Sequence, residues 1–275
     1  MSIITLTTES YCESGQIINS AAKELNYELI GNEIIDMTAK EFNVSKTLIE
    51  KAIYKAPISA DRVHPDKDKY IVYLQLLLIR KLLKDNIAYY GHGGFVLARG
   101  ISHVFKVRII ANLETRIQTM MEKESISAKA AYKSIIKNDS EYSRWSEYIF
   151  KADITNPNFY DLVINLDQIG AAKAVDIIVN TIKSKRFQPM TYSINCLKDA
   201  ELALTLKAKL LDIDPKIILT VKTGKIFIDT FCLKKNFGKN IEKINSVVAE
   251  INDINNIERL RFVEDYFETI LSGYP

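Results

Sequence analysis

Short apolar runs and amphipathic stretches alternate along the first 185 positions. A β-branched run at residues 3–7 predicts a buried strand, and apolar positions at helical spacing up to Leu25 predict a helix that begins near Gly15. The same alternation continues along the chain. Further strands are predicted at 27–30, 87–90, 104–111 and 160–165, and further helices at 33–40, 48–56, 70–83, 113–123, 127–150 and 168–185.

Strands that alternate with helices in this way favour a doubly wound α/β domain, in which helices cover both faces of a parallel sheet. One stretch has neither pattern. Residues 57–69 contain Pro57, Pro65 and many charged side chains, so we expect a loop there. The α/β domain is predicted to extend to residue 187.

The order of elements changes after Pro189, which follows the last of these helices. The pattern there predicts a helix, two strands, a helix and a strand, at 199–211, 217–221, 225–230, 241–251 and 257–263. Thr223-Gly224 lies between the first two strands and is a hairpin signal. An α-β-β-α-β order is that of a small α+β domain. We therefore predict two domains, 1–187 and 188–275.

Composition narrows the class of protein. Of the 275 residues, 47% are hydrophobic and 26% are charged, which is ordinary for a globular chain, and a net charge of +3 is too small to argue for nucleic acid. Cys12, Cys196 and Cys232 are scattered, which disfavours a disulfide framework or a structural metal site. The start has no basic segment before an apolar run, and residues 71–79 are too short to span a bilayer. A cytoplasmic protein is expected.

The first predicted loop is the main candidate for chemistry. A buried strand, a tight loop and a helix form the unit that holds phosphate in P-loop proteins, through backbone N–H groups and the helix N-terminus. We expect any phosphate to meet Ser14, Gly15, Gln16 and Ile17. The full P-loop pattern needs two glycines and a lysine, whereas residues 9–16 have one glycine and no lysine.

A second candidate follows the strand at 87–90. Gly91, His92, Gly93 and Gly94 lie where that strand ends, and glycines there let a backbone or a ligand come close. They are the predicted substrate-binding residues. His92 could contact a ligand, although a structural histidine is the favoured interpretation.

Several other residues have two interpretations at this stage. Lys106 and Arg108 could face the site, but a solvated strand edge is favoured for both. Cys12 lies near a helix N-terminus, which lowers a thiol pKa, yet an unreactive cysteine is favoured. Tyr142 and Trp145 are interpreted as helix packing in preference to a pair that stacks on a base.

Residues 1–185 resemble the cytidylate-kinase-like family of P-loop proteins. The resemblance is collinear and rests on five weak motifs, found at 25–30, 43–45, 91–94, 111–116 and 160–165. It implies a P-loop NTPase-like fold with a helical lid at 115–150, and it implies ATP, Mg²⁺ and CMP as ligands if the protein is active. Arg116 matches a family arginine, and Arg144 could partly replace another. Both are therefore the candidate catalytic residues, although an exposed helix arginine is an equal interpretation of Arg116 and a surface charge is the favoured interpretation of Arg144.

The first loop departs from this family. The family's arginine position is Thr8 here, and its three glycine positions are Tyr11, Glu13 and Ser14. Phosphoryl transfer depends on positioning and charge stabilisation, so the loss of cationic contacts is serious. A carboxylate such as Glu13 would also repel a triphosphate.

Residues 190–275 resemble a BON domain, through the hairpin at 222–226 and a closing motif at 251–257 that lacks its usual glycine. This resemblance implies a module that docks a protein or a membrane surface. Two hypotheses remain. The chain is a pseudokinase that senses a nucleotide or acts as a scaffold, or it is an active kinase that transfers the ATP γ-phosphate to CMP or a related nucleotide.

Overall fold

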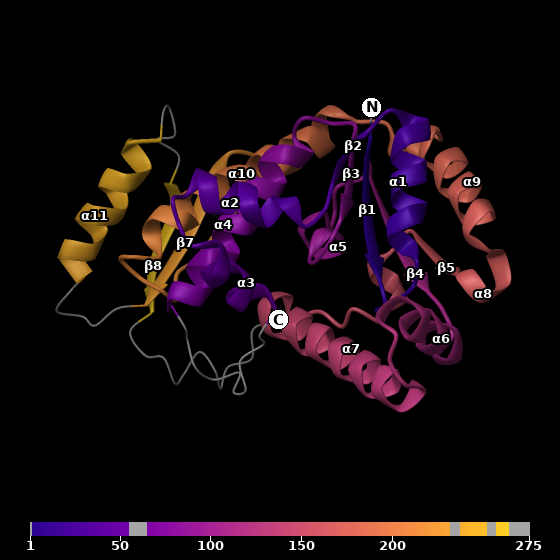
Figure 1. Cartoon of the computed structure of the whole chain (residues 1–275). Coiled ribbons are helices and arrows are strands. Elements are labelled where there is room, and N and C mark those ends of the chain that lie inside the picture. The colour runs from indigo at the N-terminus through magenta and orange to yellow at the C-terminus, as the bar shows by residue number, and fades with distance from the viewer. Residues whose placement is uncertain (1, 55–64, 232–236, 252–256, 264–275) are drawn as a thin grey trace.

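The computed structural model describes residues 2–54, 65–231, 237–251 and 257–263. Its elements alternate as the sequence predicts, and Figure 1 labels them. The strands are β1 (Ile3–Thr8), β2 (Glu28–Ile30), β3 (Ile87–Tyr90), β4 (Val104–Ile110), β5 (Leu162–Asn165), β6 (Ile218–Lys222), β7 (Lys225–Phe231) and β8 (Ile257–Val263). The α-helices are α1 (Ser14–Leu25), α2 (Glu33–Glu41), α3 (Lys46–Tyr54), α4 (Pro65–Leu82), α5 (Gly94–Leu97), α6 (Leu113–Glu124), α7 (Ala128–Phe150), α8 (Leu166–Ile169), α9 (Ala171–Ile182), α10 (Thr191–Leu210) and α11 (Phe237–Ala249).

The first five strands form one parallel sheet in the order β2-β3-β1-β4-β5. β1 lies at the centre, where Ile3 and Ile4 point to opposite faces and are both fully buried. Helices α1 and α9 cover the face of Ile4, while α2, α3 and α4 cover the face of Ile3. The predicted doubly wound α/β fold is confirmed.

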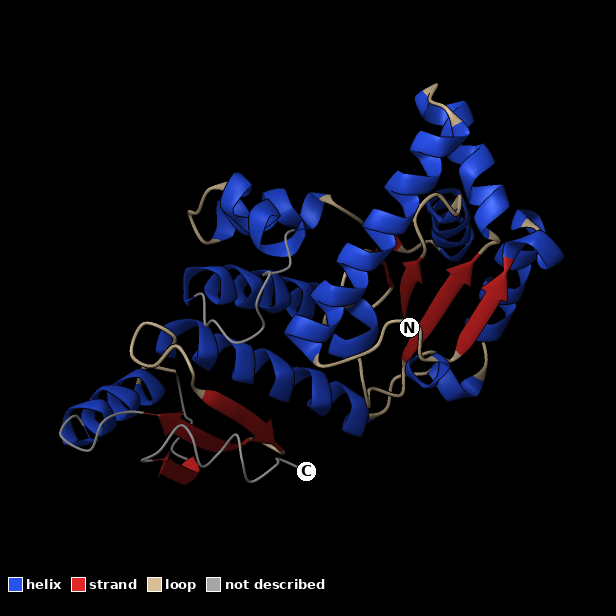
Figure 2. Ribbon diagram, turned by 90° about the horizontal axis from the view of Figure 1, so that it is seen from below, coloured by secondary structure: helices blue, strands red, loops and turns tan. Residues whose placement is uncertain are grey.

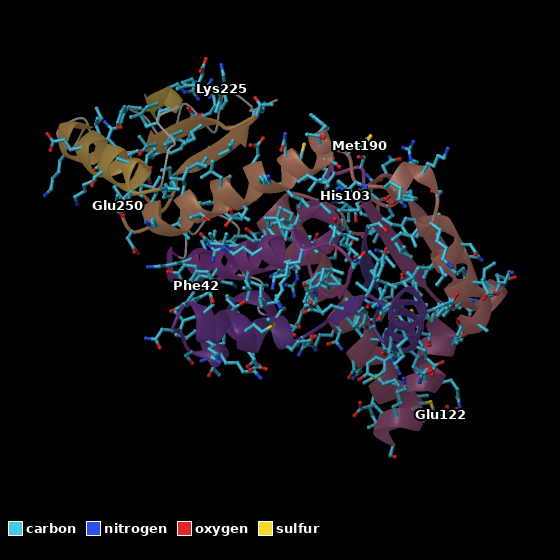
Figure 3. The ribbon with its side chains drawn as sticks, turned by 90° about the horizontal axis from the view of Figure 1, so that it is seen from above. Phe42, His103, Glu122, Met190, Lys225 and Glu250 are labelled. Carbon is cyan, nitrogen blue, oxygen red and sulfur yellow. The ribbon has the colours of Figure 1, made fainter. Side chains whose placement is uncertain are left out.

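Two helices stand at the carboxyl ends of these strands. α6 and α7 pack against each other through Met120, Ala131 and Ile135 (Figure 1). Glu122, on α6, lies at the opposite end of the molecule from Lys225 and Glu250 (Figure 3). This pair corresponds to the predicted lid and places α7 beside the loop that follows β1.

The last three strands form a second sheet in the order β6-β7-β8. β6 and β7 make the predicted antiparallel hairpin, and β8 pairs parallel to β7. The turn residues Thr223 and Gly224 both have positive φ, and both amides donate to the carboxylate of Asp199, at 2.6 and 2.9 Å. The predicted small α+β unit is therefore present. Of the predicted closing motif, residues 252–256 lie outside the described residues.

The two sheets are separate, and long helices lie between them (Figure 2). Helix α10 packs along α4, so that Val72 and Leu76 of α4 share a core with Leu206 of α10 and Ile228 of β7. The predicted boundary at residue 187 remains a prediction. Residues before this boundary and residues after it belong to one shared hydrophobic core.

Several element boundaries differ from the prediction. α4 begins at Pro65, so residues 65–69 are helical instead of a loop; proline suits a first helical position because its fixed φ fits and it has no N–H to satisfy. Residues 57–64 of that predicted loop lie outside the described part. α10 begins at Thr191, eight residues early, and Gly170 (φ 74°) separates α8 from α9. Within the described ranges, no helix is both long and apolar enough to cross a membrane.

Candidate functional site

A cleft of about 460 Å³ opens where β1 and β3 end, between α3 and α7. This is the edge at which parallel α/β sheets bind ligands. The lining combines five aromatic side chains, two carboxylates and several amides and hydroxyls. Its residues are Leu6, Thr8, Glu9, Ser10, Tyr11, Asn32, Ile53, Tyr54, Tyr90, Gly91, His92, Asn138, Glu141, Tyr142 and Trp145.

The loop after β1 turns sharply before α1. Tyr11 has φ 62°, a left-handed conformation that favours glycine, and the Ser14 amide donates to the carbonyl of Cys12. Ser14 is buried, and its hydroxyl lies 3.3 Å from that of Tyr90. The backbone and the Ser14 hydroxyl of this loop therefore make hydrogen bonds within the protein.

The predicted cofactor-binding residues are not part of the cleft lining. Ser14 is buried behind it, Ile17 is buried in the core between α1 and α9, and Gln16 is exposed. Gly15 lies against the Tyr90 ring. The loop residues that do reach the cleft come earlier, at 8–11.

Arg116 lies beside this loop with its charge already paired. Its Nη1 donates to Asp139 Oδ2 at 2.7 Å and to the Ser10 carbonyl at 3.3 Å, and its Nε lies 3.8 Å from Glu9 Oε2. Asp139 also accepts from the Ser10 amide (3.2 Å) and hydroxyl (2.7 Å). Ser10 and Arg116 thus form an oxyanion site that the carboxylate of Asp139 fills.

Arg108 is a correction to the sequence-based expectation. It is 5% exposed rather than solvated, since its guanidinium donates to the Ile154 carbonyl, lies 3.4 Å from Glu9 and covers the Tyr160 ring. Lys106 is half-buried and pairs with Asp161 at 2.7 Å. Neither side chain lines the cleft. Glu9 therefore lines the cleft and also lies within 3.8 Å of two buried arginines, Arg108 and Arg116.

The interpretation of Cys12 as unreactive is supported. Its side chain is buried, and burial, followed by the nearby Glu9 carboxylate, raises the pKa of the thiol to about 11. The position near the N-terminus of α1 does not overcome these two effects.

The glycines after β3 make room for the chain's own side chains. A Cβ at Gly91 or Gly94 would come within 2.7 Å of Tyr89, and a Cβ at Gly93 would lie 2.7 Å from Phe150. Gly91 and His92 line the cleft, whereas Gly93 and Gly94 do not. Packing accounts for the last two glycines without a ligand.

His92 lies within a cluster of aromatic rings. Its ring centroid is 4.2 Å from that of Tyr142, 5.2 Å from Trp145 and 5.5 Å from Tyr54. Burial lowers the pKa of His92 to about 4, so the ring is neutral at pH 7. Its Nδ1 and the Nε1 of Trp145 are buried without a hydrogen-bond partner. Tyr142 and Trp145 pack α7 against the His92 ring, and both also line the cleft.

Arg144, the second candidate catalytic residue, is exposed on α7 and lies outside the cleft lining. The side of α7 that faces the cleft carries Asn138, Glu141, Tyr142 and Trp145, at helical spacing. No group of three or more His, Cys, Asp or Glu side chains in the described part of the chain is arranged to hold a metal ion.

Sequence reasoning missed Tyr54 as a part of the site, and it missed that Asp139 of the lid contacts Ser10 and Arg116. Asp139 meets Ser10 across 129 positions, so no local pattern announces the contact. The signal that was available is the spacing of residues 138, 141, 142 and 145 on one side of a predicted lid helix.

Comparison with known proteins is consistent with this architecture. The model of the cytidylate kinase-like family matches residues 3–168. Among solved structures, an uncharacterized protein from Eubacterium ventriosum ATCC 27560 is 20% identical, with a TM-score of 0.52 over 67% of this chain and 99% of that chain. None of the curated proteins matches the chain.

Two further solved structures are less similar. A shikimate kinase from Bacteroides thetaiotaomicron is 10% identical, with a TM-score of 0.42 over 66% of this chain and 99% of that one. A deoxyadenosine kinase from M. mycoides is 12% identical, with a TM-score of 0.35 over 66% and 98%.

Proposed function

We propose that this chain, which belongs to the cytidylate kinase-like family, keeps the kinase fold with weak or absent phosphoryl transfer and acts as a nucleotide sensor or as a scaffold. One observation carries this proposal. The donors beside the first loop that suit a phosphate, namely the Ser10 amide and hydroxyl and Arg116, are bound to Asp139. A phosphate would have to displace this carboxylate and overcome its charge.

The residues of the loop fit a triphosphate poorly. Residues 9–16 contain no lysine that could reach the β- and γ-phosphates, and Lys123, which lies next to the loop, is paired with Glu13 at 3.8 Å. The cleft itself presents Glu9 and Glu141. Phosphoryl transfer relies on cations that stabilise charge in the transition state, so this arrangement opposes it.

We propose that the C-terminal α+β unit passes the effect of ligand binding on to a partner. Its resemblance to a BON domain suggests docking to a protein or a membrane surface, and its shared core with α4 offers a physical connection to the cleft domain. A ligand that moved α7 or α3 could be sensed through α4, because α3 packs on α4.

The alternative is an active kinase that uses ATP and Mg²⁺ to phosphorylate CMP or a related nucleotide. The position of Arg116 favours it, because a buried guanidinium next to the loop could turn to a phosphate if Asp139 released it.

A phosphoryl-transfer assay separates the two functions. The pure full-length protein is incubated with ATP-Mg²⁺ and CMP, and ADP and CDP are followed by phosphorus NMR. We expect no product above the enzyme-free control. Turnover at about 1–100 s⁻¹, the rate that is typical of kinases, would establish the alternative.

A further inference from the structure

The lid carries two rows of opposite charge on the side that points away from the rest of its domain. We propose that the lids of two copies of this chain stack face to face, with α6 of each copy lying on α7 of the other. This inference goes beyond the proposed function, because it concerns a surface outside the cleft and does not depend on whether the chain transfers phosphate.

The inner side of the lid is already occupied. Arg116 on α6 and Asp139 on α7 bond to Ser10 of the first loop, and Met120 and Ile135 pack between the two helices. The opposite side of both helices is open, and α6 lies at the other end of the molecule from β7 and β8 (Figure 1). We call this open side, within 114–122 of α6 and 129–137 of α7, the outer face of the lid.

Apolar side chains lie along the outer face on both helices. On α7, Tyr132 and Ile136 are one turn apart and are 48% and 43% exposed. On α6, Ile117 and Met121 are also one turn apart and are half-buried. Side chains at i and i+4 form the ridges through which one helix packs on another. Each copy therefore offers one short apolar ridge on each lid helix.

A row of cations runs beside the ridge of α7. Lys129, Lys133 and Lys137 are exposed at i, i+4 and i+8. Like charges at this spacing destabilise a helix. In the described part of the chain, Lys137 has one distant partner, Glu141 at 4.0 Å, while Lys129 and Lys133 form no ion pair. The row is therefore a positive surface that the chain itself does not neutralise.

The corresponding row on α6 is acidic. Glu114, Gln118 and Glu122 are exposed at the same spacing, and Gln118 donates a hydrogen bond to Glu122 at 2.7 Å. Each row extends over about 12 Å of helix, because the rise is about 1.5 Å per residue. An anionic membrane or a nucleic acid would attract α7 but would be repelled by α6. A second copy of the lid matches both rows at once.

The connection between the helices sets the relative height of the two rows. α6 ends at Glu124 and α7 begins at Ala128, so residues equally far from this connection lie at about the same height. Glu122 is therefore about level with Lys129, and Glu114 with Lys137. A two-fold axis parallel to the helices keeps these heights and places each glutamate opposite a lysine of the other copy.

The charges exclude the other symmetric arrangement. A two-fold axis that runs across the helices would stack α6 on α6 and α7 on α7, and so would oppose like charges. Two helices about 18 Å long and 10 Å wide form a small face, below the about 800 Å² per partner of a standard interface. Exposed ion pairs add little affinity. We expect a weak dimer, with a dissociation constant on the order of 100 µM.

Charge reversal followed by mixing tests this contact on the full-length chain. Sedimentation equilibrium of the wild type should show monomer and dimer between about 10 and 500 µM. One variant carries Lys129→Glu and Lys137→Glu, and the other carries Glu114→Lys and Glu122→Lys. Each alone should dimerise at least tenfold more weakly, because its two lid helices then carry like charge. An equimolar mixture should form a heterodimer, because each helix then meets opposite charge.

The matched control reverses two lysines far from the lid. Lys173→Glu with Lys183→Glu changes the net charge equally at exposed positions on and directly after α9, and it should dimerise as the wild type does. Circular dichroism checks that each variant is folded. Carbodiimide cross-linking of the wild type decides if one is not. In a mixture of unlabelled and ¹⁵N-labelled chains, Lys129 of one chain should become linked to Glu122 of the other.

The proposal is overturned if the wild type stays monomeric at about 500 µM, or if the two charge-reversed variants dimerise as well as the wild type. It is also overturned if their mixture does not associate, or if no link joins Lys129 to Glu122 of a differently labelled chain. An equal loss of dimer in the control variant would assign association to net charge, which likewise overturns the role of the lid.

Discussion

At the scale of single residues, charge pairing decides what the first loop can bind. Arg116 was identified from its motif, but its partners were not, because Asp139 and Glu9 reach it from distant parts of the chain. Periodicity predicts which side chains are buried and does not predict which buried charges meet. Arg108 illustrates the limit. It was expected to be solvated and is buried, since Glu9 and the Ile154 carbonyl satisfy it.

Removing Asp139 should open the oxyanion site. In Asp139→Ala, the Ser10 amide and hydroxyl and Arg116 lose a partner, so pyrophosphate should bind several-fold more tightly, measured by calorimetry. The free energy of unfolding should fall by about 1–3 kcal/mol, because buried donors are left unpaired. Asp161→Ala, which breaks the ion pair to Lys106 away from this loop, is the control and should not gain affinity. If Asp139→Ala also gains none, the site does not hold oxyanions.

The histidine of the aromatic cluster predicts a pH dependence of stability. Because burial lowers the pKa of His92 to about 4, the unfolded chain binds more protons than the folded chain between pH 6.5 and 4. Stability that is present above pH 6.5 is therefore lost as the pH falls through this window. Urea unfolding at pH 7 and pH 5 should show a loss on the order of 1–2 kcal/mol that His92→Phe removes. An equal loss in the variant would assign the effect to other groups.

At the scale of elements, most of the fold was predictable from the sequence. Buried strands and amphipathic helices have strong periodic patterns, so every strand and nearly every helix was found. The errors concern the residues at which helices and strands begin or end. Pro65 was assigned to a loop because proline usually breaks helices, yet it begins α4. The glycines at 91–94 were correctly expected to permit a close approach, but the approaching groups include Tyr89 and Phe150 of the same chain.

The loop between β1 and α1 offers a test at this scale. Replacing Tyr11, Glu13 and Ser14 together by glycine should restore some ATP binding, and more than Glu13→Gln alone. The triple change frees the backbone, which at Tyr11 already has a positive φ, whereas Glu13→Gln removes only the charge of an exposed carboxylate paired with Lys123. Calorimetric titration with ATP-Mg²⁺ compares the three proteins. Equal affinity in all of them would show that the loop residues do not limit binding.

At the scale of the whole molecule, the two sheets are joined by the packing of α4 on α10. The sequence indicated a break near Pro189 but not that Leu76 of α4 would be buried against the second unit. Contacts between elements far apart in sequence leave no local pattern, so the shared core could not be predicted.

Separate expression measures how much the two parts depend on each other. Fragments 1–187 and 188–275 should each fold, as judged by circular dichroism, but each should unfold at a lower urea concentration than the full chain. The reason is that separation exposes the apolar faces of α4 and α10, including Leu76 and Leu206. If both fragments are unfolded, the division into two domains is wrong. If neither loses stability, the shared core is unimportant.

The central claim is that the chain's own carboxylates occupy the place of the phosphates. Calorimetric titration of the full-length wild-type protein with ATP-Mg²⁺ tests it most directly. The amides at the start of α1 can hold an anion weakly, so we predict a dissociation constant no tighter than about 1 mM, or about 4 kcal/mol. A dissociation constant in the micromolar range would contradict the account.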